Sequence, residues 1–378
     1  MTRIIRSVLL SIFTVLLLAG NSKASDPEEK IMEDKPSGKF EAGKFVMEHV
    51  SDAFEWHIAT FGETEISVPL PIILYSSAKG WNFFMSSKFH HGKETYNGFR
   101  IGGEVKEESK DLENGQEQVK DKYEGKIVEV DQNGEVIGLP IDLSVTKTVA
   151  GIMVSVIIML LIFLNIAKTA KRTANKAPSG MQNFFEPAIL FIRDEVARPA
   201  IGENRFEKFM PFLLTLFFFI LINNILGLVP VFPFGANVTG NIAVTMVLAL
   251  FTFFITTFNT NKHYWKEIYN PDVPWWLKYP IPLMPIVELT GVITKPFVLM
   301  VRLFANMLAG HLIVTVFVSL IFIFGKMIGV EAGLGISVIS VAFSVFMLLL
   351  DVLVSFIQAY VFTLLSALYF GMASPEHH

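Results

Sequence analysis

Cysteine is absent from this chain of 378 residues, and charged residues make up only 17% of it. Without cysteine, the protein can form no disulfide bond and can use no thiol chemistry. The sequence also contains no glycine-rich phosphate-binding loop, no nucleophile arrangement and no internal repeat. These absences argue against an enzyme that carries out bond chemistry itself, and against transporters that are built from repeated halves.

Hydrophobic residues are abundant by contrast: they make up 52% of the chain, with 35 phenylalanines and a mean hydropathy of +0.49. Several apolar runs are long enough to span a membrane, so the composition predicts a membrane protein. The charge is distributed unevenly. Residues 25–144 carry 13 Lys and Arg against 24 Asp and Glu, a net charge of −11, whereas residues 145–378 carry 15 against 11, a net charge of +4.

The first 24 residues have a basic start, a short apolar stretch and a small-residue site that ends at Ala24. This pattern is typical of a secretory signal peptide, and an uncleaved membrane anchor is the alternative. Residues 25–144 are then predicted to form a small acidic periplasmic domain. Within it, Asn133-Gly134 joins two β-prone runs and predicts a hairpin.

Five membrane helices are predicted from the apolar runs, and an amphipathic segment at about 181–198 is predicted to lie in the inner interface or to pack on the protein itself. Basic residues follow the first and third spans, whereas the loop after the second span has no Lys or Arg. This asymmetry predicts a bacterial inner (plasma) membrane protein with a periplasmic mature amino terminus and a cytoplasmic carboxyl terminus. The predicted spans are about 149–167, 209–230, 241–260, 281–325 and 336–373.

The last two spans are too long to stand upright in a bilayer. As helices, 281–325 and 336–373 would be about 68 Å and 57 Å long, roughly twice the hydrocarbon thickness. A glycine-rich turn separates them, and prolines near the start of the first permit a kink. We therefore predict a hairpin of two overlong, steeply tilted helices that could wrap the curved side of another assembly.

Arg302 is the only permanent charge between Pro296 and Gly325. An arginine in hydrocarbon costs roughly 2.5 to 3.5 kcal/mol on insertion scales, and it stays protonated in proteins. Its guanidinium must therefore face water, a partner protein or a mobile carboxylate. The pattern predicts a functional site within the membrane.

Other polar residues of the hairpin recur at helical spacing. Residues seven apart share one helix face, because seven residues are two turns less about 20°. His311, nine residues beyond Arg302, points to the opposite side. The residues that share the face of Arg302 are Glu288, Lys295 and, four residues beyond, Asn306, and on the second helix Asp351 and Gln358 are seven apart.

Structural roles are possible for several of these groups. Lys295 could extend its amine to the inner interface, and Glu288 could pair with it. Asp351 and His311 could form one buried, neutral pair, which is also compatible with proton relay. The adjacent histidines 90 and 91 lack further ligand spacing and are more typical of a surface than of a metal site.

The segment KPFVLMVRLFANMLAGHL, which contains Arg302, resembles the arginine signature of subunit a of the F-type ATP synthase. The ending QAYVFTLLSALYFGMASPEHH is similar to the carboxyl terminus of that family, and NNILGLVP followed by NIAVT resembles its earlier helices. The resemblance covers about residues 145–378. It does not extend to the acidic domain.

This resemblance implies a non-catalytic stator subunit that needs no cofactor and partners the c-subunit ring and the b-subunit peripheral stalk. Protons would pass through two half-channels to and from the carboxylate of the ring. Arg302 would hold the place of the essential arginine and would lower the pKa of the passing acid. By the same resemblance, Gln358 would face Arg302. The outer half-channel would contain Asp351, His311 and Asn224, and the inner one would contain Glu288 and Asn306.

One position pair departs from the family pattern: members often carry an acid at the place of His311 and a histidine at the place of Asp351. This exchange favours a physical pair. Two other functions compete with the stator reading. A secondary transporter could bind an anionic substrate at Arg302, and a membrane scaffold could hold the arginine in a structural pair.

Overall fold

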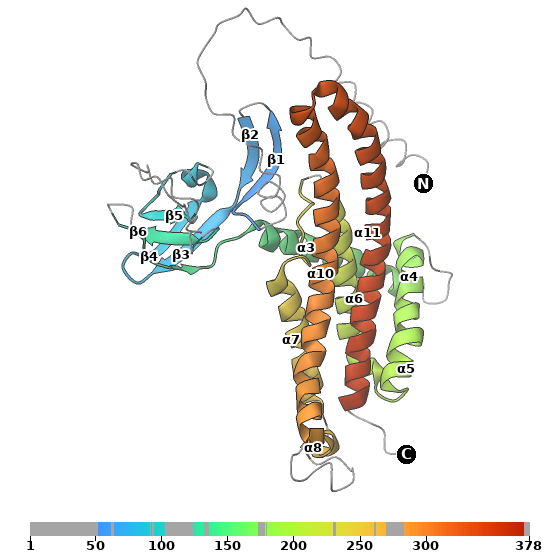
Figure 1. Cartoon of the computed structure of the whole chain (residues 1–378). Coiled ribbons are helices and arrows are strands. Elements are labelled where there is room, and N and C mark those ends of the chain that lie inside the picture. Colours follow the sequence, from blue (N-terminus) through green and yellow to red (C-terminus); the bar gives the residue numbers. More distant parts are fainter. Residues whose placement is uncertain are drawn as a thin grey trace, which may run out of the picture. The chain divides into compact units, whose positions relative to one another are not determined.

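The computed structural model describes residues 52–61, 64–90, 92, 94–102, 123, 125–131, 136–172, 178, 180–229, 232–260, 262–269 and 283–373. Strands precede helices along the chain (Figure 1). The predicted signal peptide and the Asn133-Gly134 turn lie outside the described residues. The predicted fold class is confirmed: long apolar helices, the last two of exceptional length, follow a small β-rich domain.

The β-rich domain consists of three antiparallel sheets with the strand orders β1-β2, β4-β3-β8 and β5-β6-β7. The predicted hairpin corresponds to the pairing of β6 with β7. The core of the β-rich domain contains Ile72 and Leu74 of β3, Phe99 and Ile127 of the third sheet, and Phe89, which follows β4. The strands are β1 (Glu55–Phe61), β2 (Thr64–Pro69), β3 (Pro71–Ser76), β4 (Gly80–Met85), β5 (Phe99–Ile101), β6 (Ile127–Val130), β7 (Val136–Gly138) and β8 (Ile141–Asp142).

Among the described residues, four helices are long and apolar enough to span a membrane, and α7 is a shorter apolar helix. All five predicted membrane helices are therefore present, with ends shifted by a few residues. The short helix α8 (Lys262–Tyr269) was not predicted. The apolar helices are α3 (Lys147–Arg172), α6 (Phe206–Leu228), α7 (Ile242–Phe258), α10 (Leu283–Met327) and α11 (Val330–Ala373).

Helices α10 and α11 lie side by side as a continuous hairpin (Figure 1). Each runs without a break, for 45 and 44 residues, and Pro296 lies inside α10. A break hidden inside each long apolar run was the alternative to a tilted helix, and neither helix contains one. Such helices would be about 66 to 68 Å long, so they fit a hydrocarbon core of about 30 Å only when strongly inclined.

The predicted amphipathic segment is divided into α4 (Met181–Phe191), a π-helical segment η2 (Ile192–Ala197) and α5 (Arg198–Ile201). The buried side chains of η2 and α5 join the membrane core, whereas α4 has no fully buried residue. Asp194 accepts hydrogen bonds from Arg193 at 2.9 Å and pairs with Arg198 at 3.0 Å. These cations hold the pKa of Asp194 below its usual value, the hydrogen bond from Arg193 being the main cause.

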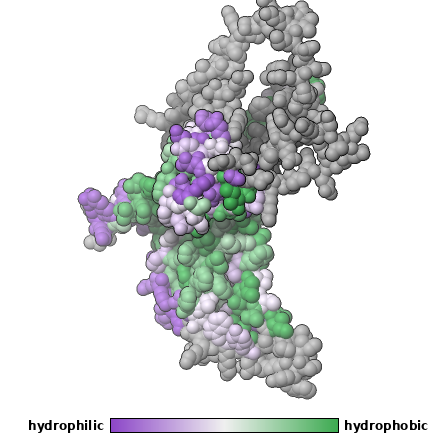
Figure 2. Space-filling view, turned by 90° about the vertical axis from the view of Figure 1, so that its left-hand side faces the viewer, coloured by the Kyte–Doolittle hydropathy of each residue, from purple (hydrophilic) through white to green (hydrophobic). Residues whose placement is uncertain are grey.

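The core of the membrane domain lies mainly between α6, α10, α11 and the η2–α5 segment. Phe209 of α6 stacks on Phe370 of α11 with ring centroids 4.8 Å apart. Between α7 and α11, the buried hydroxyls of Thr252 and Ser366 lie 3.2 Å apart and form a hydrogen bond. Figure 2 shows extended hydrophobic areas on one face of the molecule, with hydrophilic side chains gathered mainly in its upper part.

Hydrogen bonds, in addition to the continuous chain, join the β-rich domain to the start of α3. The Asp52 carboxylate accepts a hydrogen bond from the backbone N–H of Thr148 at 2.9 Å, and the N–H of Lys147 donates to the carbonyl of Ala53 at 2.8 Å. Asp52 thus satisfies one of the free N–H groups at the helix amino terminus. Trp56 also packs against Val238 in the loop that precedes α7.

Candidate functional site in the long hairpin

Arg302 lies on an exposed face of α10. Its apolar neighbours on this face include Val298, which is 41% exposed, and Val301, which is 36% exposed, and Asn306 is exposed one turn further on. Arg302 forms no ion pair or hydrogen bond with another described residue. The prediction that this guanidinium faces water, a partner protein or a mobile carboxylate fits this geometry.

A second group of polar side chains is buried where α6, α10 and α11 meet. Three of their atoms have no hydrogen-bond partner among the described residues: Asn224 Nδ2, His311 Nε2 and Asp351 Oδ2. Buried polar atoms are normally paired, and those that are not call for water or a mobile group. Sequence analysis assigned these three residues to the outer half-channel, and in each of them one buried atom is open to a further partner.

Close packing of helices at two glycines positions these groups. A Cβ atom built at Gly227 of α6 would lie 3.6 Å from His311 Nε2, and one built at Gly310 of α10 would lie 2.6 Å from Asp351 Oδ1. Asp351 is 8% exposed and Gln358, seven residues on, is 7% exposed. The imidazole of His311 thus approaches α6, while the carboxyl of Asp351 packs on α10.

No hydrogen bond or ion pair joins Asp351 to His311 in the part of the chain that the structure describes, and each keeps one unpaired buried atom. A direct hydrogen-bonded pair is therefore not the arrangement present here. Gln358 and Arg302 also differ in exposure, the first being buried and the second exposed. Any transfer between these groups would require water or movement of the side chains.

Sequence analysis missed Thr239, whose hydroxyl donates a hydrogen bond of 2.5 Å to Asn224 Oδ1 and is buried. The triplet Asn237-Val238-Thr239 matches a glycosylation sequon. That match is misleading, because the Nδ2 atom of Asn237 is buried and its Oδ1 accepts a hydrogen bond from Gly240. In the sequence, the only indication of a role for Thr239 was a threonine after an apolar residue in the loop between two spans.

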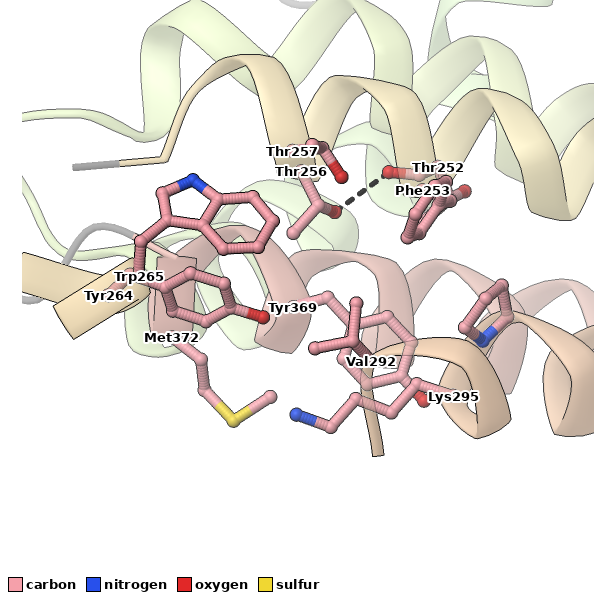
Figure 3. A pocket seen from close by; sticks show the side chains of 11 residues that line it. Thr252, Phe253, Thr256, Thr257, Tyr264, Trp265, Val292, Lys295, Tyr369 and Met372 are labelled. Carbon is pink, nitrogen blue, oxygen red and sulfur yellow. Dashed lines mark hydrogen bonds between the residues drawn. The ribbon is translucent and has the colours of Figure 1, made fainter. Parts of the chain in front are cut away.

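On another side of the hairpin, side chains of α7, α8, α10 and α11 line an open cavity (Figure 3). Lys295 contributes its amine to this cavity, 5.8 Å from the ring centroid of Tyr369. Burial raises the pKa of Tyr264, which also lines the cavity, and the negative charge of Glu288 raises it further. Glu288 itself is exposed.

The hairpin and its neighbours thus carry three separate kinds of polar group. A fixed cation lies on an exposed apolar face. An acid, an imidazole and an amide each have one buried atom without a partner among the described residues, and a lysine lines a cavity together with two tyrosines. Groups of these types can relay protons, and arginine can attract a carboxylate from a second chain.

Residues 151–371 match the protein family described as ATP synthase A chain. Residues 45–147 match a domain of unknown function, DUF8433. The two matches meet near the start of α3, where the strands give way to helices.

Individual relatives agree with the family match. ATP synthase subunit a 2 of Chlorobaculum tepidum is 42% identical over 239 residues, which is 62% of this chain and 64% of the relative. ATP synthase subunit a of Chloroherpeton thalassium is 44% identical over 245 residues, or 63% and 69% of the two chains. The subunit a of Myxococcus xanthus is 42% identical over 250 residues, or 63% and 76%. The chain therefore belongs to the ATP synthase A chain family, the family of the multi-pass, non-catalytic, proton-conducting stator subunit of Fo.

Proposed function

We propose that this chain forms the static wall of two proton half-channels and couples the proton gradient to rotation of a c-subunit ring through Arg302. The observation that carries the proposal is the position of this guanidinium on an exposed apolar face, with no ion pair among the described residues. A ring carboxylate that passes this face would be attracted by the cation and would release its proton, since an opposite charge lowers the pKa of an acid.

The outer half-channel would use the buried groups between α6, α10 and α11. His311 and Asp351 would exchange protons through water, since each has a buried atom available for a further hydrogen bond. Asn224, fixed by Thr239, would orient that water rather than titrate. Gln358 would lie at the inner end of this path, near the ring carboxylate.

The inner half-channel would begin at Glu288 and use Asn306 near the ring. The open cavity in Figure 3, which Lys295 lines two turns beyond Glu288 on α10, supports a route on this side of the hairpin. Arg302 would separate the two routes and would keep protons from passing directly from one to the other. A proton would therefore cross only by travelling on the ring.

The wider assignment follows from the same proposal. The partners would be the c-subunit ring and the b-subunit peripheral stalk, in a bacterial inner membrane, with the mature amino terminus in the periplasm and the carboxyl terminus in the cytoplasm. Residues 1–24 would be the signal peptide, 25–144 the periplasmic domain and 145–378 the membrane domain. The basic residues after the first and third spans support this orientation.

Passive proton flux through membranes stripped of the soluble ATPase part tests the proposal. Asp351→Asn should abolish gradient-driven flux, because an amide cannot exchange a proton at neutral pH. Arg302→Ala should leave an assembled complex that no longer couples ATP hydrolysis to pumping. Ser355→Ala is the matched control for the buried position: Ser355 lies one turn from Asp351, and its hydroxyl donates at 2.7 Å to the backbone carbonyl of Asp351, not to its carboxyl.

The results separate the candidate functions. Normal ATP-driven pumping in assembled Arg302→Ala would refute the stator role of this residue. Failure of Arg302→Ala to assemble, with the Ser355→Ala complex intact, would favour the scaffold, in which the arginine pairs structurally. Equal flux in Asp351→Asn and Ser355→Ala would remove Asp351 from the outer path.

A further inference from the structure

We propose that the β4-β3-β8 sheet of the domain of unknown function docks on the lipid surface beside α3 through one uncharged, apolar face. We call this the outer apolar face. It consists of Pro71, Ile73, Tyr75, Trp81, Phe83, Met85, Ile141 and Leu143. The proposal concerns the β-rich domain and is independent of the proton path.

Strand register places these residues on one side of the sheet. Tyr75 pairs with both Trp81 and Ile141, and directly paired residues of antiparallel strands point to the same face. Alternate residues along a strand also share a face, so Phe83 follows Trp81. The intervening residues of β3, Ile72 and Leu74, point the other way and are 1% and 0% exposed in the domain core.

The outer face is apolar although it is uncovered in the structure. Trp81 is 57% exposed and Phe83 is 69% exposed, and their rings stack with centroids 6.0 Å apart. Tyr75 adds a third ring, 5.1 Å from that of Trp81. A solvated face of an antiparallel sheet normally carries polar side chains. A contiguous apolar face on such a sheet indicates a surface that is covered in the working protein.

The position of the sheet in the chain favours lipid as the covering material. Strand β8 ends at Asp142 and α3 begins at Lys147, so the five intervening steps can span at most about 18 Å. Asp52 and Ala53, just before β1, are hydrogen-bonded to the first turn of α3. The domain is therefore held at the end of a membrane-spanning helix and cannot move away from the bilayer surface.

Exposed apolar side chains continue from the sheet onto that helix. Ile141 and Leu143 are 60% and 56% exposed, and Val149, Met153 and Ile157 of α3 are 40%, 56% and 55% exposed. In a membrane span, exposed side chains of this type face lipid. The outer apolar face thus lies, along the chain, within a few residues of helix positions that face lipid.

The side-chain chemistry agrees with this position. Tryptophan and tyrosine are enriched where a protein meets the headgroup region, because each has an apolar ring and one polar group. The face has no charged member, although residues 25–144 carry a net charge of −11. Docking would therefore rely on insertion of apolar rings, and the acidic surface elsewhere would stay in water.

Depth-dependent quenching of a fluorophore tests the proposal, and the lack of native cysteine allows a single reactive site to be introduced. Phe83→Cys carries a small environment-sensitive dye on the outer apolar face. Lys126→Cys is the matched control, because Lys126 is exposed in the same domain but precedes β6 of another sheet. Both variants are studied in the full chain, within the purified Fo complex reconstituted in phospholipid vesicles.

We expect spin-labelled phospholipid to quench the dye at position 83 several-fold more strongly than the dye at position 126, with aqueous iodide giving the opposite order. Equal quenching at the two positions by both agents would overturn the proposal. So would protection of position 83 from lipid and iodide together, which would indicate a protein partner. Met85→Cys, on the same face, repeats the measurement should Phe83→Cys fail to fold.

Discussion

Gly310 should be intolerant of even one added methyl group, because the Asp351 carboxyl occupies the space beside it. A Cβ atom at position 310 would lie 2.6 Å from Oδ1, 3.0 Å from Cγ and 3.1 Å from Oδ2 of Asp351. All three atoms belong to one rigid planar group. The carboxyl must therefore move as a whole in Gly310→Ala, or the two helices must separate.

The size of the effect follows from the cost of overpacking, which is about 1 to 3 kcal/mol for an added methylene in a packed interior. If that cost is relieved by displacing the carboxyl, the population with Asp351 in its present position falls by about 5- to 150-fold. Since Asp351 is proposed to relay protons, passive flux through Fo should fall by at least about five-fold, the lower end of this range.

Passive proton flux through stripped membranes measures the effect, with Gly291→Ala as the control. Gly291 lies in the same helix, and nothing lies within 4 Å of a Cβ atom built there. Gly291→Ala should leave flux unchanged, because the added methyl group meets no neighbour. The substitution should not disturb the helix either, since alanine favours a helix over glycine by about 1 kcal/mol. The reasoning is refuted if Gly310→Ala, assembled at wild-type levels, conducts as well as Gly291→Ala.

Two further substitutions probe contacts that sequence analysis did not reveal. Thr239→Val removes the hydroxyl that donates to Asn224 and leaves another buried group unpaired, at a cost of about 1 to 3 kcal/mol. Passive proton flux should fall in Thr239→Val and should be retained in Thr239→Ser, which keeps the hydroxyl. Equal flux in both variants would show that the hydrogen bond is dispensable. Gly371→Ala would bring a methyl group against the backbone carbonyl of Ala200, which cannot rotate away as a side chain can. The detergent-solubilised complex of this variant should lose thermal stability or fail to assemble. An unchanged melting temperature would contradict the packing of α5 on α11.

The helical part of the fold was predictable because it depends on long apolar runs. All five spans were predicted, and the overlong final pair was inferred from the lack of a polar break between 281 and 325. Helix α8 was missed because its eight residues are too few and too polar to stand out. The π-helical turn at η2 depends on packing against α6 and α11, which the sequence alone does not display.

The β-rich domain was less predictable. The hairpin of β6 and β7 was inferred from its turn sequence, but β3 and β4 were overlooked because apolar residues occupy both of their faces. A strand that is apolar on both sides lacks the alternation by which exposed strands are recognised. The feature that concealed these strands is the same one that suggests a docking surface.

At the site, residue spacing predicted which polar groups share a helix face, but the partners across helices needed the structure. Spacing within α10 separated His311 from Arg302, and the structure agrees, with His311 approaching α6 and Arg302 exposed. The contact of Asp351 with Gly310 joins residues of different helices. No periodicity within one helix could have revealed it.

The exposed surface around Arg302 also bears on how a ring could turn against it. Val298 and Val301 on α10 are exposed and have no polar atoms in their side chains. Contacts of this kind are non-directional, so each identical subunit of a rotating ring would meet nearly the same attraction at any angle. Sliding would then be smooth, and the single guanidinium would provide the one point at which the ring pauses.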